Sequence, residues 1–92
     1  MAVKTYYYIK RFKGIELKKS IKVNLQIETD GDWILSIGNL NLFAYGENLS
    51  KVKKEIKQDL YHLYNSLFID NLRVAGSAKI IKENFKEYLN GS

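Results

Sequence analysis

The chain has 92 residues, of which 46% are hydrophobic, and a formal net charge of +5. This length predicts a single domain over residues 1–92. There is no cysteine and one histidine, which excludes disulfide frameworks, thiol catalysis and Cys/His zinc sites. The most apolar stretch, residues 33–46, is interrupted by polar residues, so we expect no signal peptide, no membrane span and a cytoplasmic location.

The positive charge is unevenly distributed along the chain. Residues 1–22 hold seven basic side chains and one acidic one, and residues 51–57 hold four and one. Residues 23–50 hold four acidic side chains and no basic ones, whereas the charges balance over residues 58–92. This distribution favours contact with nucleic acid or an acidic protein surface, and the alternative is that the charges only keep the protein in solution.

The first half of the chain predicts two long strands. Residues 3–12 are rich in tyrosine, with aromatic residues on both faces, so the pattern leaves open which face is buried. Lys13-Gly14 predicts a tight turn. Apolar and polar residues then alternate over residues 15–27, which indicates a half-buried strand that bends or bulges where Lys19 falls on the apolar side.

Two shorter strands are predicted next. Asp30-Gly31 is typical of a hairpin turn, and residues 33–37 form the strand after it. Gly38-Asn39 predicts another turn, and residues 40–45 predict a fourth strand. Because each strand follows the previous one through a short turn, we expect an antiparallel meander.

The longest helix is predicted over residues 49–69, with Asn48 or Ser50 as its cap. Its apolar residues recur every three or four positions, which places them on one stripe. The stripe consists of Leu49, Val52, Ile56, Leu60, Leu63 and Leu67.

A second helix is predicted over residues 77–90, after a loop at residues 70–76, with Ser77 as its cap and Gly91 as its end. The element order β-β-β-β-α-α predicts an α+β fold. In this fold a four-stranded antiparallel meander sheet carries the long amphipathic helix and the short C-terminal helix on one face.

No pattern indicates catalysis. His62 falls with Glu55 and Asp59 on the side of the long helix opposite the apolar stripe, which predicts a solvated face, and a metal would need ligands that the chain does not supply. The glycines are isolated, so no phosphate-binding loop is present. We therefore predict that the protein is not an enzyme and has no cofactor or metal site.

A basic and aromatic flank lies beside the apolar stripe of the long helix. Lysines near a helix N-terminus oppose the helix dipole and cost about 0.3–1 kcal/mol each, which suggests a role in binding. Tyr64 and Phe68 lie on the same flank, either as part of a binding surface or as a widening of the core. The candidate binding surface is Lys10, Arg11, Lys51, Lys53, Lys54, Lys57 and Tyr61.

The run Tyr6-Tyr7-Tyr8 has three interpretations. Tyrosines next to basic residues can stack on unpaired bases, and they can also belong to the core of a strand or to its solvent face. A tyrosine-rich edge strand can instead pair with a second copy of the chain. We take the run as a candidate dimer strand.

One segment resembles a known family. Residues from about 27 to 66 include IETDGDWILSIGNLNLFAYGENLSKVKKEIKQDLYHLY, which resembles the core of HicB-type antitoxins. The shared features are a charged hairpin turn, an aromatic-apolar-apolar-Ser-apolar strand at Trp33 to Ile37, and a leucine at Leu40. A Gly-acid-polar-Leu sequence, Gly46 to Leu49, then opens an amphipathic helix.

The resemblance implies a HicB-like core over about residues 21–69 that assembles into dimers or larger. In that family the core covers the active surface of a small toxin ribonuclease of the HicA type, within a toxin-antitoxin system. Acidic contacts to such a partner would come from Glu28, Asp30, Asp32 and Glu47. Gly38-Asn39 replaces the proline-containing turn of the family, and no DNA-binding domain is predicted after the core.

We therefore expect a non-enzymatic interaction module, HicB-like and homodimeric, that binds and neutralises a protein partner. Two alternatives stay open. The first is a basic nucleic-acid-binding module that uses the lysines of residues 51–57 and the N-terminal basic arm. The second is a small inhibitor encoded by a virus or a mobile element.

Overall fold

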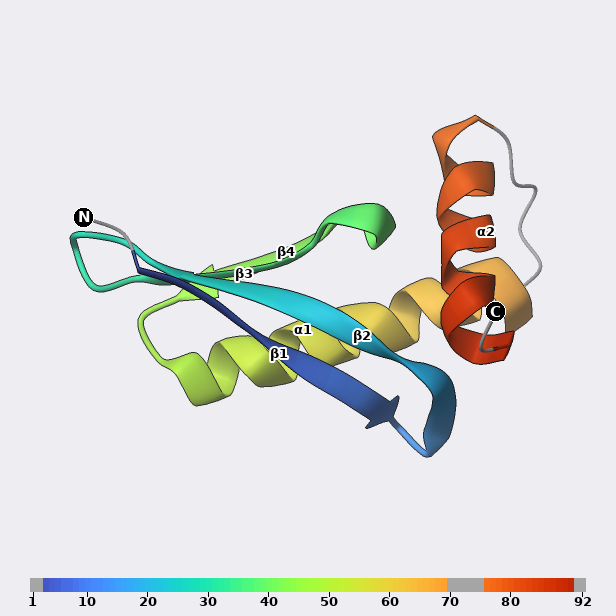
Figure 1. The fold of residues 1–92 in the computed structure, drawn as a ribbon, viewed down its shortest axis with the longest axis horizontal. Coiled ribbons are helices and arrows are strands. Elements are labelled where there is room, and N and C mark those ends of the chain that lie inside the picture. Colours follow the sequence, from blue (N-terminus) through green and yellow to red (C-terminus); the bar gives the residue numbers. More distant parts are fainter. Residues whose placement is uncertain (1–2, 70–75, 91–92) are drawn as a thin grey trace.

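The computed structural model describes residues 3–69 and 76–90. Four strands form one antiparallel sheet in the order β1-β2-β3-β4 (Figure 1). The strands are β1 (Val3–Phe12), β2 (Ile15–Ile27), β3 (Trp33–Ile37) and β4 (Leu42–Gly46). The predicted meander is confirmed, because every strand pairs with its neighbours in sequence.

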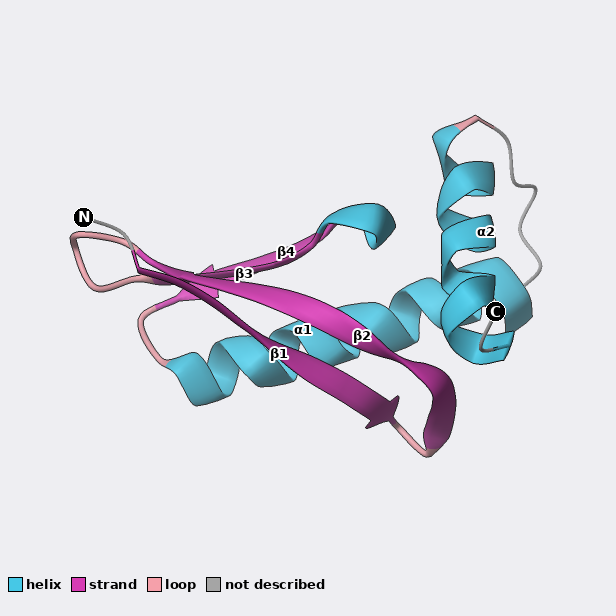
Figure 2. Ribbon diagram, viewed as in Figure 1, coloured by secondary structure: helices cyan, strands magenta, loops and turns pink. Residues whose placement is uncertain are grey.

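Two helices follow the sheet, and Figure 2 shows them in cyan and the strands in magenta. The long helix α1 (Leu49–Tyr64) continues as a π-helical segment, Asn65–Ile69, and α2 (Ser77–Asn90) comes after it. The predicted α+β fold is confirmed. Within residues 3–69 and 76–90, neither helix has the length and apolar character that crossing a membrane requires.

The irregularity predicted in the second strand is present. Ile9 of β1 pairs with Ile21 of β2, yet Arg11, only two residues later, pairs with Glu16. Several residues of β2 therefore lie opposite a single residue of β1, which is a bulge and bends the strand. The bulge includes Lys19, which is exposed, so the charge avoids the core.

The hydrophobic core lies between the sheet and the helices. Leu35 and Ile37 of β3 and Ile56 and Leu60 of α1 are each 1% exposed or less. The predicted stripe of α1 therefore faces the sheet, although Leu63 at its side is only half-buried. The buried residues are Ile9, Phe12, Leu17, Ile21, Val23, Leu25, Leu35, Ile37, Leu40, Ala44, Val52, Ile56, Leu60, Leu67, Phe85 and Tyr88.

The start of α1 is fixed by its cap and by a close approach to β4. The side chain of Asn48 accepts a hydrogen bond from the Lys51 amide at 3.2 Å, which satisfies one of the unpaired first-turn donors. A Cβ at Gly46 would lie 3.1 Å from Cγ2 of Val52. Glycine therefore allows the helix to turn back tightly under the sheet.

The predicted start of the fourth strand is wrong. The fourth strand begins at Leu42 rather than residue 40, because Gly38–Leu40 forms a 3-10 turn that ends at Asn41 in the left-handed region, φ 55°. This turn buries Leu40, which is 1% exposed.

The long helix changes from α-helical to π-helical geometry before its predicted end at residue 69. Its α-helical part stops at Tyr64, and the wider turn Asn65–Ile69 follows. Within this turn Leu67 is buried and the neighbouring Phe68 is packed against the core. The wider π-helical turn changes the direction of the side chains after Tyr64, and both Leu67 and Phe68 pack toward the core.

Helix α2 packs against β2 and the 3-10 turn. The Asn39 side chain donates a hydrogen bond to the Tyr88 hydroxyl at 2.6 Å, and the Asn84 side chain donates one to the Asn39 carbonyl at 2.7 Å. The ring of Phe85 lies 6.0 Å from that of Phe12. The predicted loop at residues 70–75, the Ser77 side chain and Gly91 lie outside the described residues.

Candidate binding surfaces

One face of the sheet is not covered by either helix. The strand register sets Tyr6 opposite Asn24, Asn24 opposite Ser36, and Ser36 opposite Phe43. This row crosses all four strands with an aromatic residue at each edge and polar residues between them. The aromatic side chains are strongly exposed, with Phe43 at 62% and Tyr45 at 76%. We call this surface the open face; it comprises Tyr6, Tyr8, Lys22, Asn24, Gln26, Ile34, Ser36, Phe43 and Tyr45.

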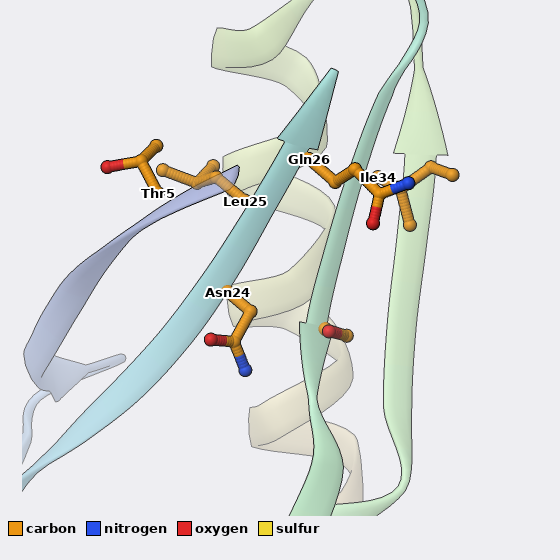
Figure 3. A pocket seen from close by; sticks show the side chains of 6 residues that line it. Thr5, Asn24, Leu25, Gln26 and Ile34 are labelled. Atoms are coloured by element: carbon orange, nitrogen blue, oxygen red, sulfur yellow. The ribbon is translucent and has the colours of Figure 1, made fainter. Parts of the chain in front are cut away.

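The centre of the open face contains a shallow hollow of about 210 Å³. Figure 3 shows Asn24 and Gln26 of β2 and Ile34 of β3 around it. Thr5, Leu25 and Ser36 complete its lining, so amide and hydroxyl groups lie beside two apolar side chains, Leu25 and Ile34. Such a surface can accept an apolar side chain of a partner and hydrogen-bond its surroundings.

One corner of the open face is organised by a cation–π contact. The rings of Tyr6 and Tyr8 meet edge to face with centroids 5.7 Å apart. The Lys22 ammonium lies 4.4 Å from the Tyr6 ring centroid. The predicted dimer strand therefore presents two of its three tyrosines on this face.

The third tyrosine of the run points the other way. Tyr7 is half-buried on the helix side, where the Lys53 ammonium lies 4.8 Å from its ring centroid. Its hydroxyl is buried and has no hydrogen-bond partner among the described residues. Burial raises the pKa of Tyr7 above its ordinary value of 10.0, because desolvation disfavours the phenolate.

The tyrosine run lies on an edge strand of the sheet. In the described part of the chain β1 pairs only with β2, and β4 only with β3. The outer edge of each therefore carries backbone groups that another strand can pair with. This is the geometry that strand-to-strand dimerisation needs.

A second surface lies on the helix side. The side chains of Lys13, Lys54, Lys57 and Gln58 line a groove of about 220 Å³ between the β1–β2 turn and α1. We call it the basic groove. The Lys13 ammonium lies 6.0 Å from the Tyr61 ring centroid, so the turn reaches across to the helix.

The structure brings together only part of the predicted basic surface. Lys54 and Lys57 line the groove, and Tyr61 contacts Lys13 beside it. The other predicted residues do not line the groove: Lys53 covers Tyr7, and Lys10, Arg11 and Lys51 are exposed elsewhere. The sequence did not indicate Lys13 as a binding residue, because its position predicts only a tight turn. In the structure Lys13 adds a positive charge where the β1–β2 turn meets α1.

Tyr64 and Phe68 belong to the core and not to a binding surface. The ring centroid of Phe85 lies 6.1 Å from that of Tyr64 and 5.7 Å from that of Phe68. Phe12 completes the cluster, 6.1 Å from Tyr64. Of the two interpretations of this flank, the widening of the core is therefore correct.

A third feature is an acidic end of the sheet. Because Trp33 pairs with Gly46, the residues next to them, Asp32 and Glu47, lie at the same end of the sheet. The Asp30 side chain accepts a hydrogen bond from the Asp32 amide at 3.1 Å, and Glu28 accepts one from Gln26 at 2.8 Å. Glu28, Asp30, Asp32 and Glu47 thus form an acidic end that adjoins the open face at Gln26.

The one histidine does not organise a site. His62 is exposed, and its ring lies 6.3 Å from that of its neighbour Tyr61. Over residues 3–69 and 76–90, no three imidazole or carboxylate side chains gather closely enough to hold a metal ion.

Comparison with protein-family models, with curated proteins and with solved structures returned no match for this chain.

Proposed function

We propose that the protein is a non-enzymatic interaction module of the HicB-like antitoxin type, which binds and neutralises a small basic protein such as a toxin ribonuclease. The observation that carries the proposal is the open face, where four aromatic side chains are each 54% exposed or more. Exposed aromatic residues on one face are typical of protein-binding sites. The proposed partner contact comprises Tyr6, Tyr8, Phe43 and Tyr45 with the hollow between them.

Charge supports a basic partner. The acidic end adjoins the open face, since Gln26 lies on that face and its side chain is hydrogen-bonded to Glu28. Residues 23–50, which supply the acidic end, contain no basic side chain. A cationic protein surface would therefore meet carboxylates at the border of the aromatic contact, which favours rapid and correctly oriented association.

We also propose a homodimer formed through β1. The strand is ten residues long and lies at the edge of the sheet. It carries one charge, Lys4, before Lys10, and a long edge strand with few charges over most of its length tends to pair with another chain. A dimer of this kind would extend the sheet across both copies and would place two open faces side by side.

The test uses a purified HicA-type ribonuclease and a labelled RNA. We expect the protein to stop RNA cleavage at a stoichiometric ratio. Replacing Phe43 and Tyr45 together by serine is expected to weaken this inhibition by at least about tenfold, because buried aromatic residues dominate interface energies. RNA cleavage that continues at a large excess of the protein would contradict the proposal.

The matched control replaces Ile69 and Ile80 by serine. These two residues are 62% and 64% exposed, as large apolar residues outside the open face. The control variant is expected to inhibit like the parent protein. Equal losses in both variants would show that general surface hydrophobicity, and not the open face, drives binding. Light scattering on the same samples reports the dimer, and a particle of 10.7 kDa at high concentration would contradict it.

A further inference from the structure

We propose that the basic groove binds the phosphodiester backbone of nucleic acid without reading base sequence. This is a second binding site, on the helix side of the molecule, and it does not depend on the proposed protein partner. Every side chain that lines the groove, Lys13, Lys54, Lys57 and Gln58, ends in a hydrogen-bond donor. None of them is a carboxylate, so the groove offers donors and positive charge together.

In the part of the chain that the structure describes, the lysines of the groove have no ion-pair partner. Lys54 and Lys57 are three residues apart on α1, so they lie on neighbouring positions of one helix surface, where like charges repel each other. Among residues 3–69 and 76–90 the single ion pair is Lys86 with Glu83, at 3.3 Å on α2. An anion from outside the chain would relieve this repulsion.

Lys13 provides an independent indication. Its φ is 48° and that of Gly14 is 80°, the pattern of a type I′ turn, whose positions favour Asn, Asp and Gly. A left-handed backbone is sterically unfavourable for a residue with a Cβ. Lysine is thus a poor choice for the turn itself, but from this position its charge reaches the groove and Tyr61. A strained backbone conformation that is retained at a residue such as Lys13 suggests that this residue has a function.

The chemistry of the groove matches phosphates better than bases. Lysine ammonium groups act as point charges toward phosphate oxygens. Tyr64 and Phe68, which might have stacked on bases, are packed against Phe85 instead. The groove lining therefore contains charge without an aromatic side chain, and the Tyr61 ring beside it is approached by Lys13, so we expect similar binding of DNA and RNA.

The experiment measures fluorescence anisotropy of labelled single-stranded DNA, duplex DNA and RNA with the full chain, from low salt to about 0.2 M. Three phosphate contacts predict a slope of log affinity against log salt of about −2 to −3. DNA and RNA affinities within about tenfold of each other are expected. A strong preference for one base sequence, or no binding at the lowest salt, would overturn the proposal.

The groove variant combines Lys13→Asn, Lys54→Gln and Lys57→Gln. Asparagine suits the left-handed turn, so this variant keeps the fold, which circular dichroism checks. The control combines Lys18→Gln, Lys19→Gln and Lys79→Gln, three exposed lysines outside the groove, and it has the same net charge. We expect the groove variant to lose about tenfold or more in affinity and most of the salt slope, and the control to lose little.

Two outcomes would show that any positive surface suffices. One is an equal loss of affinity in the groove variant and in the control variant. The other is a polyglutamate chain that displaces the nucleic acid as well as unlabelled DNA does, since carboxylates would then replace phosphates.

Discussion

The two faces of the sheet differ in exposure, although the same four strands form both: one face is buried against the helices and the other is exposed. In β3, Leu35 and Ile37 face the helices and are at most 1% exposed, while Ser36 between them lies on the open face. In β1 three tyrosines follow one another, and only Tyr7 faces the helices. The environment of each residue is therefore set by which side α1 covers, and not by its hydrophobicity.

Because of this difference, we expect residues of the covered face to determine stability and residues of the open face to determine binding. Residues on the covered face have many packed neighbours, so a change there alters the free energy of unfolding. Residues on the open face contact mainly solvent, so a change there affects partners. Phe43 is as apolar as the buried Phe12 and Phe85, yet it is 62% exposed. The predictions below test this separation, beginning with the largest effect.

The helix that covers the inner face should be the most sensitive element. Ile56→Ala and Leu60→Ala are each expected to lower the free energy of unfolding by about 2–5 kcal/mol, because both side chains are 0% exposed. Lys54→Ala, on the exposed side of the same helix, should cost almost nothing. Denaturant unfolding measures all three. Equal losses at positions 54 and 56 would contradict the helix register.

The second prediction concerns the hydroxyl group of Tyr7 on the covered face. Its hydroxyl is buried without a hydrogen-bond partner among the described residues. Removing an unsatisfied buried polar group is stabilising, so Tyr7→Phe is expected to raise the free energy of unfolding by about 1 kcal/mol at neutral pH. Tyr8→Phe, where the ring is 54% exposed, is the matched control and should change little.

The same pair of variants should also differ in alkali. Burial raises the folded-state pKa of Tyr7 above 10.0, so the unfolded chain loses this proton at a lower pH than the folded one. The stability contributed by Tyr7 is complete below about pH 10 and is lost as pH rises through the folded-state pKa. Unfolding measured against pH should show a shallower alkaline loss in Tyr7→Phe than in Tyr8→Phe; identical profiles would contradict the assignment.

The smallest effect on stability is expected on the open face. Phe43→Ala and Tyr45→Ala should each change the free energy of unfolding by less than about 0.5 kcal/mol, because little of either side chain is packed. Thermal unfolding measures this directly. A loss of several kcal/mol at either position would mean that the open face is covered in solution, and dilution would then lower the melting temperature if a second copy covers it.

Local patterns were sufficient to predict most of the fold. The alternation over residues 15–27, the turn residues at Lys13-Gly14 and Asp30-Gly31, and the apolar stripe of the long helix each depend on residues close in sequence. The bulge at Lys19 was also predictable, since a charge on the apolar side of a strand has to leave the core. The misplaced start of the fourth strand and the π-helical end of the long helix lie where core packing, through Leu40 and Leu67, overrides the local pattern.

The candidate surfaces could be predicted only in part. The lysines of α1 and the tyrosine run of β1 are visible in the sequence, and so are their charge and aromatic character. Their surroundings are not, because they depend on residues distant in the chain. Lys13 meets Lys54 and Lys57 only after the β1–β2 turn has packed beside α1.

The sequence by itself determined the order and type of the elements, the meander and the buried side of α1, since these follow from periodicity and turn chemistry over a few residues. Only the tertiary structure decided which tyrosines of β1 face α1 and that Tyr64 and Phe68 join Phe85 in the core. The open face, the acidic end and the basic groove also exist only in the tertiary structure, because their residues are distant in the chain. Each of these depends on how the sheet and helices pack in space, a relation that no local pattern of residues contains.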